Sequence, residues 1–171
     1  QRNGTNDTDV WLTKSTDGGN TWTTPIRVND DPPGRHQFFT WMTIDQSTGY
    51  LYFVFYDRRN HSNNATDVYM AVSYDGGETF TNFKVSESPF TPSGGQFFGD
   101  YNNISAVNGQ VRPIWTRRES NGSLAIYTAI VDMTTFLPES DEGMLHLEPT
   151  SPNPFNQYTI CSFRLTKASQ V

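Results

Sequence analysis

The sequence predicts an all-β fold built from a repeated four-stranded antiparallel unit. Aromatic residues make up 14% of the chain, and 13 glycines and 10 prolines favour many short strands and turns over helices. Short apolar runs recur between Gly-rich turns. An eight-residue turn sequence occurs twice, at residues 15–22 and 73–80, with the copies 58 residues apart. These observations predict a repeat protein.

The repeat extends beyond this turn on both sides. Its period, 58 to 59 residues, is too long for a helical-hairpin solenoid and suits a four-stranded blade of a β-propeller. The matching segments are 9–12 with 67–70, 37–39 with 96–98, and 56–59 with 115–118.

The strands expected in chain order follow from the same patterns. Residues 9–15 alternate apolar and polar side chains, and residues 25–29 resume an extended pattern after the first turn, so together they predict a hairpin. The run 51–55 is apolar on both faces, as in a strand buried between two layers. Further strands are expected at 39–45, 50–58, 68–73, 83–86, 101–107, 111–117 and 124–131.

The order of these strands predicts how the chain divides into blades and modules. If blade strands are named A to D from the axis outward, the chain holds C and D of one blade, A to D of the next, and A to C of a third. We therefore interpret 1–133 as partial propeller blades, 134–150 as an acidic linker and 151–171 as the start of another module. Gln1 is not an initiator Met, so we expect the C-terminal piece of a longer protein that supplies the other blades.

Composition bounds the partners and cofactors. The formal net charge of −6 argues against sequence-independent binding to nucleic-acid phosphates, and no apolar run reaches the length of a membrane span. Cys161 is the only cysteine, and the three histidines show no ligand spacing, so neither an internal disulfide nor a zinc site is predicted. Asn29, Asp30, Asp31 and Asp100 carry oxygen atoms that calcium would accept, with solvated loop acids as the alternative; no other cofactor is expected.

The repeated turn has a structural interpretation. The carboxylates of Asp17 and Asp75 are expected to accept hydrogen bonds from turn N–H groups, while glycines take the positive φ values and an aromatic side chain packs beneath the turn. These acids are therefore predicted to be structural rather than catalytic. The structural set is Ser15, Asp17, Gly19, Trp22, Ser73, Asp75, Gly77 and Phe80.

Both copies of the turn resemble Asp boxes, the bacterial neuraminidase repeats of sialidase-type β-propellers. The resemblance covers about residues 9–132 and implies a complete parent that is six-bladed and sialidase-like. It leaves the chemistry open, because Asp boxes also occur in the sorting-receptor family resembling sortilin, in some glucan hydrolases and in propellers without known catalysis.

The terminal segment resembles a second family. Residues 151–156, Ser-Pro-Asn-Pro-Phe-Asn, followed by Ile160, Phe163 and Leu165, are similar to the start of the C-terminal sorting domains of type IX secretion cargo. The resemblance implies a truncated β-sandwich module, contact with the secretion machinery, and a bacterial protein that is exported across the outer membrane and is secreted or attached to the cell surface. The alternative is an ordinary Pro-rich linker before one strand.

Turn parity locates the candidate site. Turns A-to-B and C-to-D share one face of an antiparallel blade, and loops B-to-C and D-to-A share the other, so the arginine doublets lie opposite the Asp boxes. Sialidases resembling this fold hold the substrate carboxylate with three arginines, and use a Tyr–Glu nucleophilic pair and an Asp acid/base. The resemblance and the break in the repeat at Asp100 and Tyr101 give the predicted catalytic residues Arg58, Arg117, Tyr101 and Asp100, and the substrate-binding residues Arg35, Arg59 and Arg118.

Alternatives remain for both the arginines and the function. The doublets would also fit a repeated blade feature that pairs with Asp57, Glu119 or backbone carbonyls. The enzyme hypothesis is a secreted sialidase-like glycoside hydrolase that acts on glycans or glycoproteins. The competing hypotheses are a non-catalytic surface propeller that binds glycans or proteins, and a structural or processing domain of an exoprotein. In the binding hypothesis, the contacts are the loop aromatics Phe38, Phe90, Phe97 and Phe98.

Overall fold

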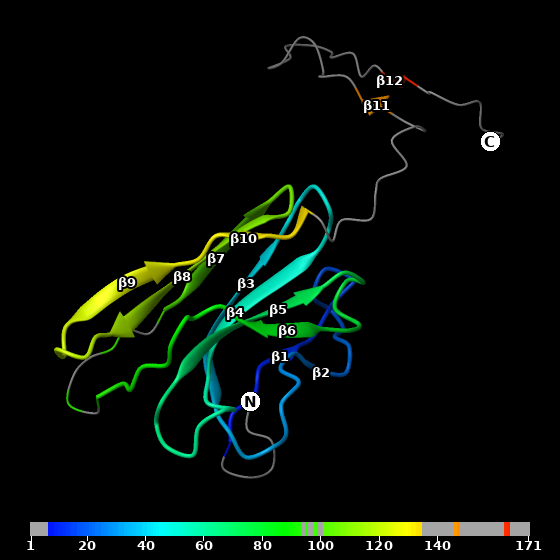
Figure 1. The fold of residues 1–171 in the computed structure, drawn as a ribbon. Coiled ribbons are helices and arrows are strands. Elements are labelled where there is room, and N and C mark those ends of the chain that lie inside the picture. Colours follow the sequence, from blue (N-terminus) through cyan, green and yellow to red (C-terminus); the bar gives the residue numbers. More distant parts are fainter. Residues whose placement is uncertain are drawn as a thin grey trace. The chain divides into compact units, whose positions relative to one another are not determined.

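A computed structural model of the chain shows an all-β protein (Figure 1). It describes residues 7–93, 95, 98 and 101–134, together with the short strands 146–147 and 163–164. No α-helix occurs among these residues, and every strand pairing is antiparallel, so the all-β prediction is confirmed. The chain divides into two compact units, Gln1–Thr134 and Thr135–Val171.

Ten strands belong to the first unit and two to the second. Those of the first unit are β1 (Trp11–Leu12), β2 (Ile26–Arg27), β3 (Gln37–Ile44), β4 (Leu51–Asp57), β5 (Asp67–Ser73), β6 (Thr81–Lys84), β7 (Asn103–Val107), β8 (Gln110–Arg118), β9 (Leu124–Thr128) and β10 (Val131–Asp132). Those of the second unit are β11 (His146–Leu147) and β12 (Phe163–Arg164), which pair with each other. The strand β11 falls within the span 134–150 that the sequence indicated as a linker.

The first unit contains one hairpin and two larger sheets. The hairpin is β1–β2, and the next sheet runs β3-β4-β5-β6 in chain order. In the third sheet β8 lies between β7 on one edge and β9 and β10 on the other; β9 and β10 continue one register along β8. The single strand expected at 124–131 is therefore present as two pieces.

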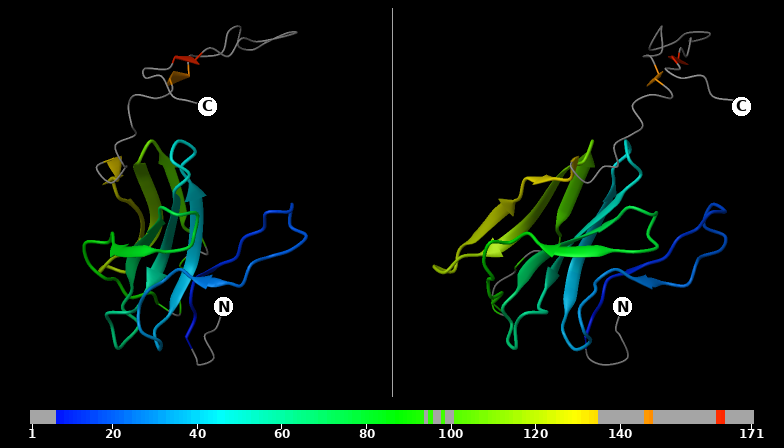
Figure 2. Two further views of the ribbon diagram at one scale, coloured as in Figure 1. Left: turned by 90° about the vertical axis from the view of Figure 1, so that its right-hand side faces the viewer. Right: turned by 45° about the vertical axis from the view of Figure 1, so that its right-hand side comes forward.

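Sheet β3–β6 is the middle of three layers, as two turned views show (Figure 2). Every residue of β4 and β5 is buried. On one face of the sheet, Leu51, Phe53 and Phe55 pack with Val10 and Val28 of the hairpin. This packing confirms half of the expectation that the run 51–55 is covered on both sides.

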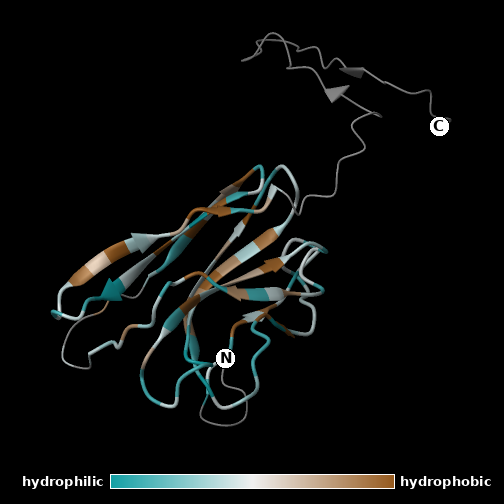
Figure 3. Cartoon of the chain, viewed as in Figure 1, coloured by the Kyte–Doolittle hydropathy of each residue, from teal (hydrophilic) through white to brown (hydrophobic). Residues whose placement is uncertain are grey.

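The other face of the middle sheet packs against sheet β7–β10. Tyr52 and Val54 belong to one buried cluster with Ile104, Val111 and Trp115. Strands β3 and β7 also lie in contact. Hydrophobic residues accordingly run along the strands of the middle layer (Figure 3), and the expected two-sided burial of β4 is complete.

Two side chains of the middle sheet bond to the third sheet. The Asp45 carboxylate accepts a 2.7 Å hydrogen bond from the backbone N–H of Gly109, which joins the β3–β4 turn to the β7–β8 turn. Burial alone would raise the pKa of Asp45, but N–H and hydroxyl donors from Gly109 and Ser47 lower it below its ordinary value. At the other end, the Tyr56 hydroxyl donates to Thr116 O at 2.6 Å and accepts from Thr116 N at 3.1 Å.

Hairpins β1–β2 and β5–β6 are structural copies. In the first, the backbone N–H of Val10 donates to Asn29 Oδ1 at 2.8 Å; in the second, the N–H of Val68 donates to Ser86 Oγ at 2.9 Å. Both devices satisfy a buried backbone donor with a polar side chain from the neighbouring segment. The sequence repeat of 58 residues is thus also a repeat of hydrogen bonding.

Strand β8 departs from the repeat spacing by one residue. Phe55 pairs with Tyr69 across β4–β5, and Trp115 pairs with Tyr127 across β8–β9. Both pairs lie on the face that packs on the preceding layer, so Trp115 corresponds to Phe55 at a spacing of 60, whereas the sequence match was 59. One residue of offset reverses the face of a strand side chain. Arg58 therefore lies on the face of its sheet that meets β7–β10, and Arg117 on the opposing face.

Candidate functional site

The first repeated turn uses its acid to hold the loop together. The Asp17 carboxylate accepts hydrogen bonds from Thr21 N at 2.9 Å, Thr21 Oγ1 at 2.7 Å and Ser15 Oγ at 2.7 Å. These donors, the Thr21 hydroxyl above all, lower the pKa of Asp17 to about 2. Gly18 and Gly19 take φ values of 73° and 90°, which side chains resist.

The second turn repeats this arrangement. Asp75 accepts from Thr79 N at 3.0 Å, Thr79 Oγ1 at 2.6 Å and Ser73 Oγ at 2.7 Å, and the pKa of Asp75 is lowered further than that of Asp17, again chiefly by the threonine hydroxyl. Phe80 packs on Phe53 with ring centroids 5.7 Å apart. The acid, serine and glycine positions therefore have the geometry expected of a structural turn.

Trp22 differs from the expected packing. Its Nε1 donates to Gly19 O at 3.1 Å, so the ring lies on its own turn, but 61% of the residue is exposed. Phe80 is half-buried because the second turn lies against the hairpin layer; no described residue covers Trp22 in the same way.

The loops that carry the arginine doublets lie at the opposite end of the strands from these turns. Neighbouring strands are antiparallel, so the connections alternate between the two ends of each sheet. Arg58 and Arg59 lie in the β4–β5 loop, and Arg117 and Arg118 end β8, before the β8–β9 loop.

Arg59 is neutralised by acids. Its Nε donates to Asp57 Oδ2 at 2.8 Å, and it also bonds to Asp30 and, at 3.1 Å, to Asn82 Oδ1. Burial alone would lower the pKa of Arg59, but Asp57 and Asp30 raise it; burial raises the pKa of Asp57 itself. The guanidinium also lies 4.2 Å from the centre of the Tyr69 ring. Arg59 thus matches the structural alternative weighed for the doublets.

Arg58 has neutral neighbours. Its Nε donates to Thr66 Oγ1 at 3.2 Å, Nη1 lies 3.5 Å from Asn64 Oδ1, and the guanidinium lies 5.0 Å from the centre of the Phe38 ring. Among the described residues no carboxylate forms an ion pair with Arg58. Burial lowers the pKa of Arg58. A half-buried cation without an acid nearby is a place where an anion would be stabilised.

Arg117 also lacks a short bond to an acid. Its Nη2 donates to Ser88 Oγ at 2.8 Å, and the guanidinium lies 5.2 Å from the centre of the Tyr127 ring. Its buried Nε has no hydrogen-bond partner in the described part of the chain, and Glu119 Oε1 lies 3.8 Å away. This long ion pair leaves a donor of Arg117 unused.

A Tyr–Glu pair lies beside Arg117. The Tyr127 hydroxyl donates to Glu119 Oε1 at 2.7 Å, and this bond to a carboxylate raises the pKa of Tyr127. The sequence analysis named neither residue as part of a pair. The available signal was local: Glu119 follows Arg117 by two residues, and Tyr127 lies where β9 must pair with the end of β8.

Aromatic side chains fill the space between the two free arginines. The Tyr56 ring lies 5.3 Å from Phe38 and 5.7 Å from Phe90, and Phe90 pairs through its backbone with Thr66, the neighbour of Arg58. The loop that carries Phe90 also carries Ser88, the partner of Arg117. We call this set the arginine–aromatic cluster: Phe38, Tyr56, Arg58, Phe90, Arg117, Glu119 and Tyr127.

The other predicted site residues lie outside the cluster. Tyr101 is 77% exposed and lines a shallow groove of about 390 Å³ with Trp41, Ile114 and Ile126. Arg35 is half-buried in the β2–β3 loop, and no described hydrogen bond or ring contact joins Arg35 or Tyr101 to the cluster. Arg118 is half-buried beside Gly122. Asp100 and Phe97 lie outside the described residues.

The acids considered as calcium ligands are engaged by cations and amides. Asp31 accepts from Asn29 Nδ2 at 2.7 Å and from Arg27, and Asp30 pairs with Arg59. Within the described ranges, no group of three or more His, Cys, Asp or Glu side chains could hold a metal ion. Calcium at residues 29–31 with Asp100 stays a prediction.

Comparisons with known proteins add no relative. No family model matches the chain, and no curated protein matches it. The described residues include no helix that is long and apolar enough to cross a membrane.

Proposed function

We propose that this chain is part of a secreted sialidase-like β-propeller that acts on glycans through Arg58 and Arg117. Support for the propeller comes from the stacking of the first unit: a hairpin, a four-stranded meander and a further meander follow one another as three layers. The two turns with Asp-box bonding lie at the same end of these layers. Successive meanders stacked face to face are the arrangement of propeller blades.

The observation that carries the functional proposal is the state of the arginines. Arg59 is bonded to two acids, whereas Arg58 has neutral partners and Arg117 keeps a buried Nε without a hydrogen bond in the described residues. Guanidinium groups bind carboxylates through two parallel hydrogen bonds. The proposed ligand is therefore a sugar that carries a carboxylate.

The Tyr127–Glu119 pair supports hydrolysis rather than binding alone. A tyrosine that is hydrogen-bonded to a carboxylate can lose its proton to that carboxylate as it attacks a sugar carbon. A neutral nucleophile avoids the repulsion that a second carboxylate would exert on an anionic sugar. In this proposal Tyr127 is the nucleophile, Glu119 its base, and Arg117 the neighbour that orients both.

The test is hydrolysis of a fluorogenic sialoside by the full-length protein. We expect turnover in the parent, and a loss of about 100-fold or more in kcat/KM for Arg117→Ala and Tyr127→Phe. Arg112→Ala is the matched control, since Arg112 bonds to backbone carbonyls of β8 and β10 away from the cluster. No turnover across sialosides and other glycosides would sink the enzyme proposal.

A second candidate function, glycan binding without catalysis, is favoured by the groove at Trp41 and Tyr101. Both rings are exposed, and Asn102 and Asn103 line the same groove. Aromatic rings beside amide groups suit the apolar faces and hydroxyls of sugars. Binding on a glycan array that is lost in Trp41→Ala, with no hydrolysis of the bound glycans, would favour this candidate.

Export remains a separate proposal that rests on residues 151–171. Of these, the structure describes the strand β12. We expect that deletion of the protein from Ser151 onward traps it inside the bacterial cell. Unchanged secretion of the deleted form, measured by immunoblot of the medium, would refute the sorting role.

A further inference from the structure

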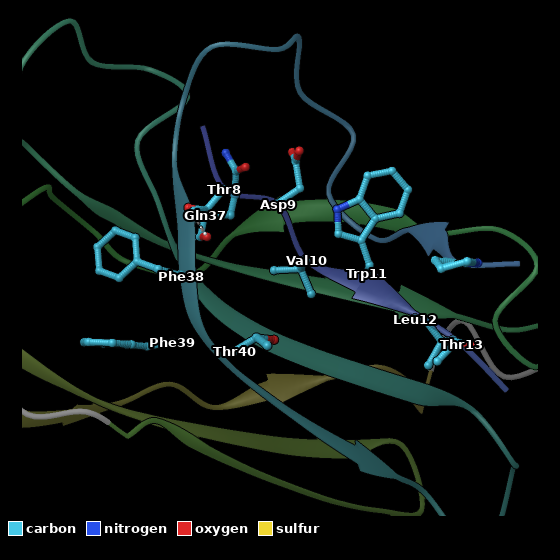
Figure 4. Close-up of a pocket in the computed structure, with 11 residues that line it drawn as sticks. Thr8, Asp9, Val10, Trp11, Leu12, Thr13, Gln37, Phe38, Phe39 and Thr40 are labelled. Carbon is cyan, nitrogen blue, oxygen red and sulfur yellow. Dashed lines mark hydrogen bonds between the residues drawn. The ribbon is translucent and has the colours of Figure 1, made fainter. Parts of the chain in front are cut away.

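A groove of about 510 Å³ runs between β1 and β3 (Figure 4). Its walls come from the two strands and from Pro25 near the start of β2. Val10, Leu12, Phe38 and Phe39 give it apolar surface. The groove is separate from the arginine–aromatic cluster, with which it shares Phe38.

One wall of the groove is an open strand edge. Val28 N donates to Val10 O and Thr23 N donates to Lys14 O, both at 2.9 Å, so the backbone groups of Val10 and Lys14 face β2. Backbone groups alternate along a strand, and those of Trp11 and Thr13 therefore point into the groove. Within the described residues no backbone hydrogen bond reaches them from that side.

The repeat supplies a template for what fits this edge. β1 corresponds to β5 at a spacing of 58, so Trp11 and Thr13 take the places of Tyr69 and Ala71. The same edge of β5 is paired along its whole length by β4, where Phe55 lies opposite Tyr69 and Phe53 opposite Ala71.

The surface beside the groove is apolar and uncovered. Met42 and Ile44 of β3 lie opposite Phe53 and Leu51, so they belong to the face on which the hairpin packs. The hairpin covers Phe53 and Leu51, yet Met42 and Ile44 are 42% and 41% exposed. One more strand next to β1, on the side of β3, would cover both.

We propose that the groove seats one additional antiparallel strand with the chemistry of β4, contributed by another copy of the repeat in the same protein. The strand donates to and accepts from the backbone of Trp11 and Thr13, and its apolar side chains cover Met42 and Ile44. This inference rests on the repeat and the open edge, and its failure would leave the glycan proposal unaffected.

The first experiment uses this chain with a synthetic peptide that has the sequence of residues 51–59. Amide hydrogen exchange is measured with and without the peptide. We expect the amides of Trp11 and Thr13 to exchange about tenfold more slowly or less when the peptide is bound, while amides of β9 do not change. A control peptide with both phenylalanines replaced by aspartate should give no protection. Equal exchange with both peptides would overturn the proposal.

Two variants keep the test independent of folding. Thr13→Pro removes an edge N–H that the described hairpin does not use. Met42→Glu places a charge beneath the added strand at an exposed position. Both variants should keep the parent's circular dichroism and lose the peptide's protection; retained protection in both would contradict the inference.

The intact protein decides where the strand comes from. In the intact protein, amides of Trp11 and Thr13 should already exchange slowly, and added peptide should change nothing. Fast exchange there would overturn the proposal. Protection accompanied by a dimer in light scattering, with monomers in Thr13→Pro, would replace it with pairing between two copies.

Discussion

At the scale of single residues, the repeated acids act through their ionised form. Asp75 accepts three short hydrogen bonds within its turn, and its pKa lies well below the ordinary value of 3.8. The folded-state pKa is depressed relative to the unfolded chain. The stabilisation is therefore complete above about pH 4 and is lost as the pH falls through the folded-state pKa.

We predict that Asp75→Asn lowers the melting temperature at pH 7, and that the difference from the parent narrows as the pH is lowered from 5 toward 2. The physical reason is that protonation removes from the parent the same charge that the variant lacks. Glu87→Gln, a change at an exposed carboxylate outside the turns, should show no such narrowing. A difference independent of pH would contradict the role of the ionised carboxylate.

The arginine doublet at residues 58–59 offers a second comparison. Arg59→Ala leaves the fully buried Asp57 without its cation and should reduce the free energy of unfolding by about 3 kcal/mol. Arg58→Ala removes a group with neutral partners and should cost less than half as much. Urea denaturation measures both. Equal losses would mean that Asp57 is stabilised by other donors.

At the scale of elements, the two turns differ in what they touch. Gly19 and Gly77 occupy the same turn position with φ values of 90° and 88°. A Cβ at Gly19 would meet nothing closer than Trp22 Cζ2 at 3.8 Å, whereas a Cβ at Gly77 would lie 2.4 Å from Leu12 Cδ2. The β5–β6 turn is thus packed on the hairpin layer, and the β1–β2 turn is open.

This difference gives a matched pair of substitutions. Gly19→Ala and Gly77→Ala carry the same backbone strain, so we expect Gly77→Ala to be more destabilising by about 1 kcal/mol, from displacement of Leu12. Thermal denaturation of the two variants measures the difference. Equal stabilities would show that the turn does not pack on β1.

The strands were predictable from sequence because their signals are local. Alternation, two-sided apolar runs and repeated Gly-rich turns located the strands of the first unit, and the two-sided burial of β4 followed from residues 51–55. The register of β8 was not predictable, since the match of Arg58 with Arg117 conceals an offset of one residue. Register depends on cross-strand packing, as in the pair Trp115–Tyr127, which sequence spacing does not encode.

At the scale of the whole molecule, the described core lies within residues 10–133. Both buried clusters are made by the hairpin and the two sheets of the first unit. We predict that a chain ending at Thr134 melts within about 2 °C of the full chain, because the truncation removes no member of either cluster. Scanning calorimetry is the measurement, and a drop of several degrees would show that the second unit stabilises the first.

The site was predictable in part for the same reason as the fold. Turn parity correctly directed attention to the end of the strands that carries Arg58 and Arg117. It could not distinguish Arg59, which Asp57 and Asp30 neutralise, from Arg58, which has neutral partners. That distinction depends on the β2–β3 loop reaching the β4–β5 loop, a contact between segments far apart in sequence. The pair Tyr127–Glu119 was missed because it forms across β8 and β9.

The bond between Tyr56 and Thr116 bears on the order in which the sheets form. Strand β7 pairs with β8 only as far as Ile114, so the backbone of Thr116 finds its partner in a hydroxyl from β4. The third sheet cannot complete its own hydrogen bonding until β4 is in place, whereas the described ladder of the middle sheet is complete without β8. Assembly should accordingly proceed outward from the middle sheet, with each layer closing the previous one.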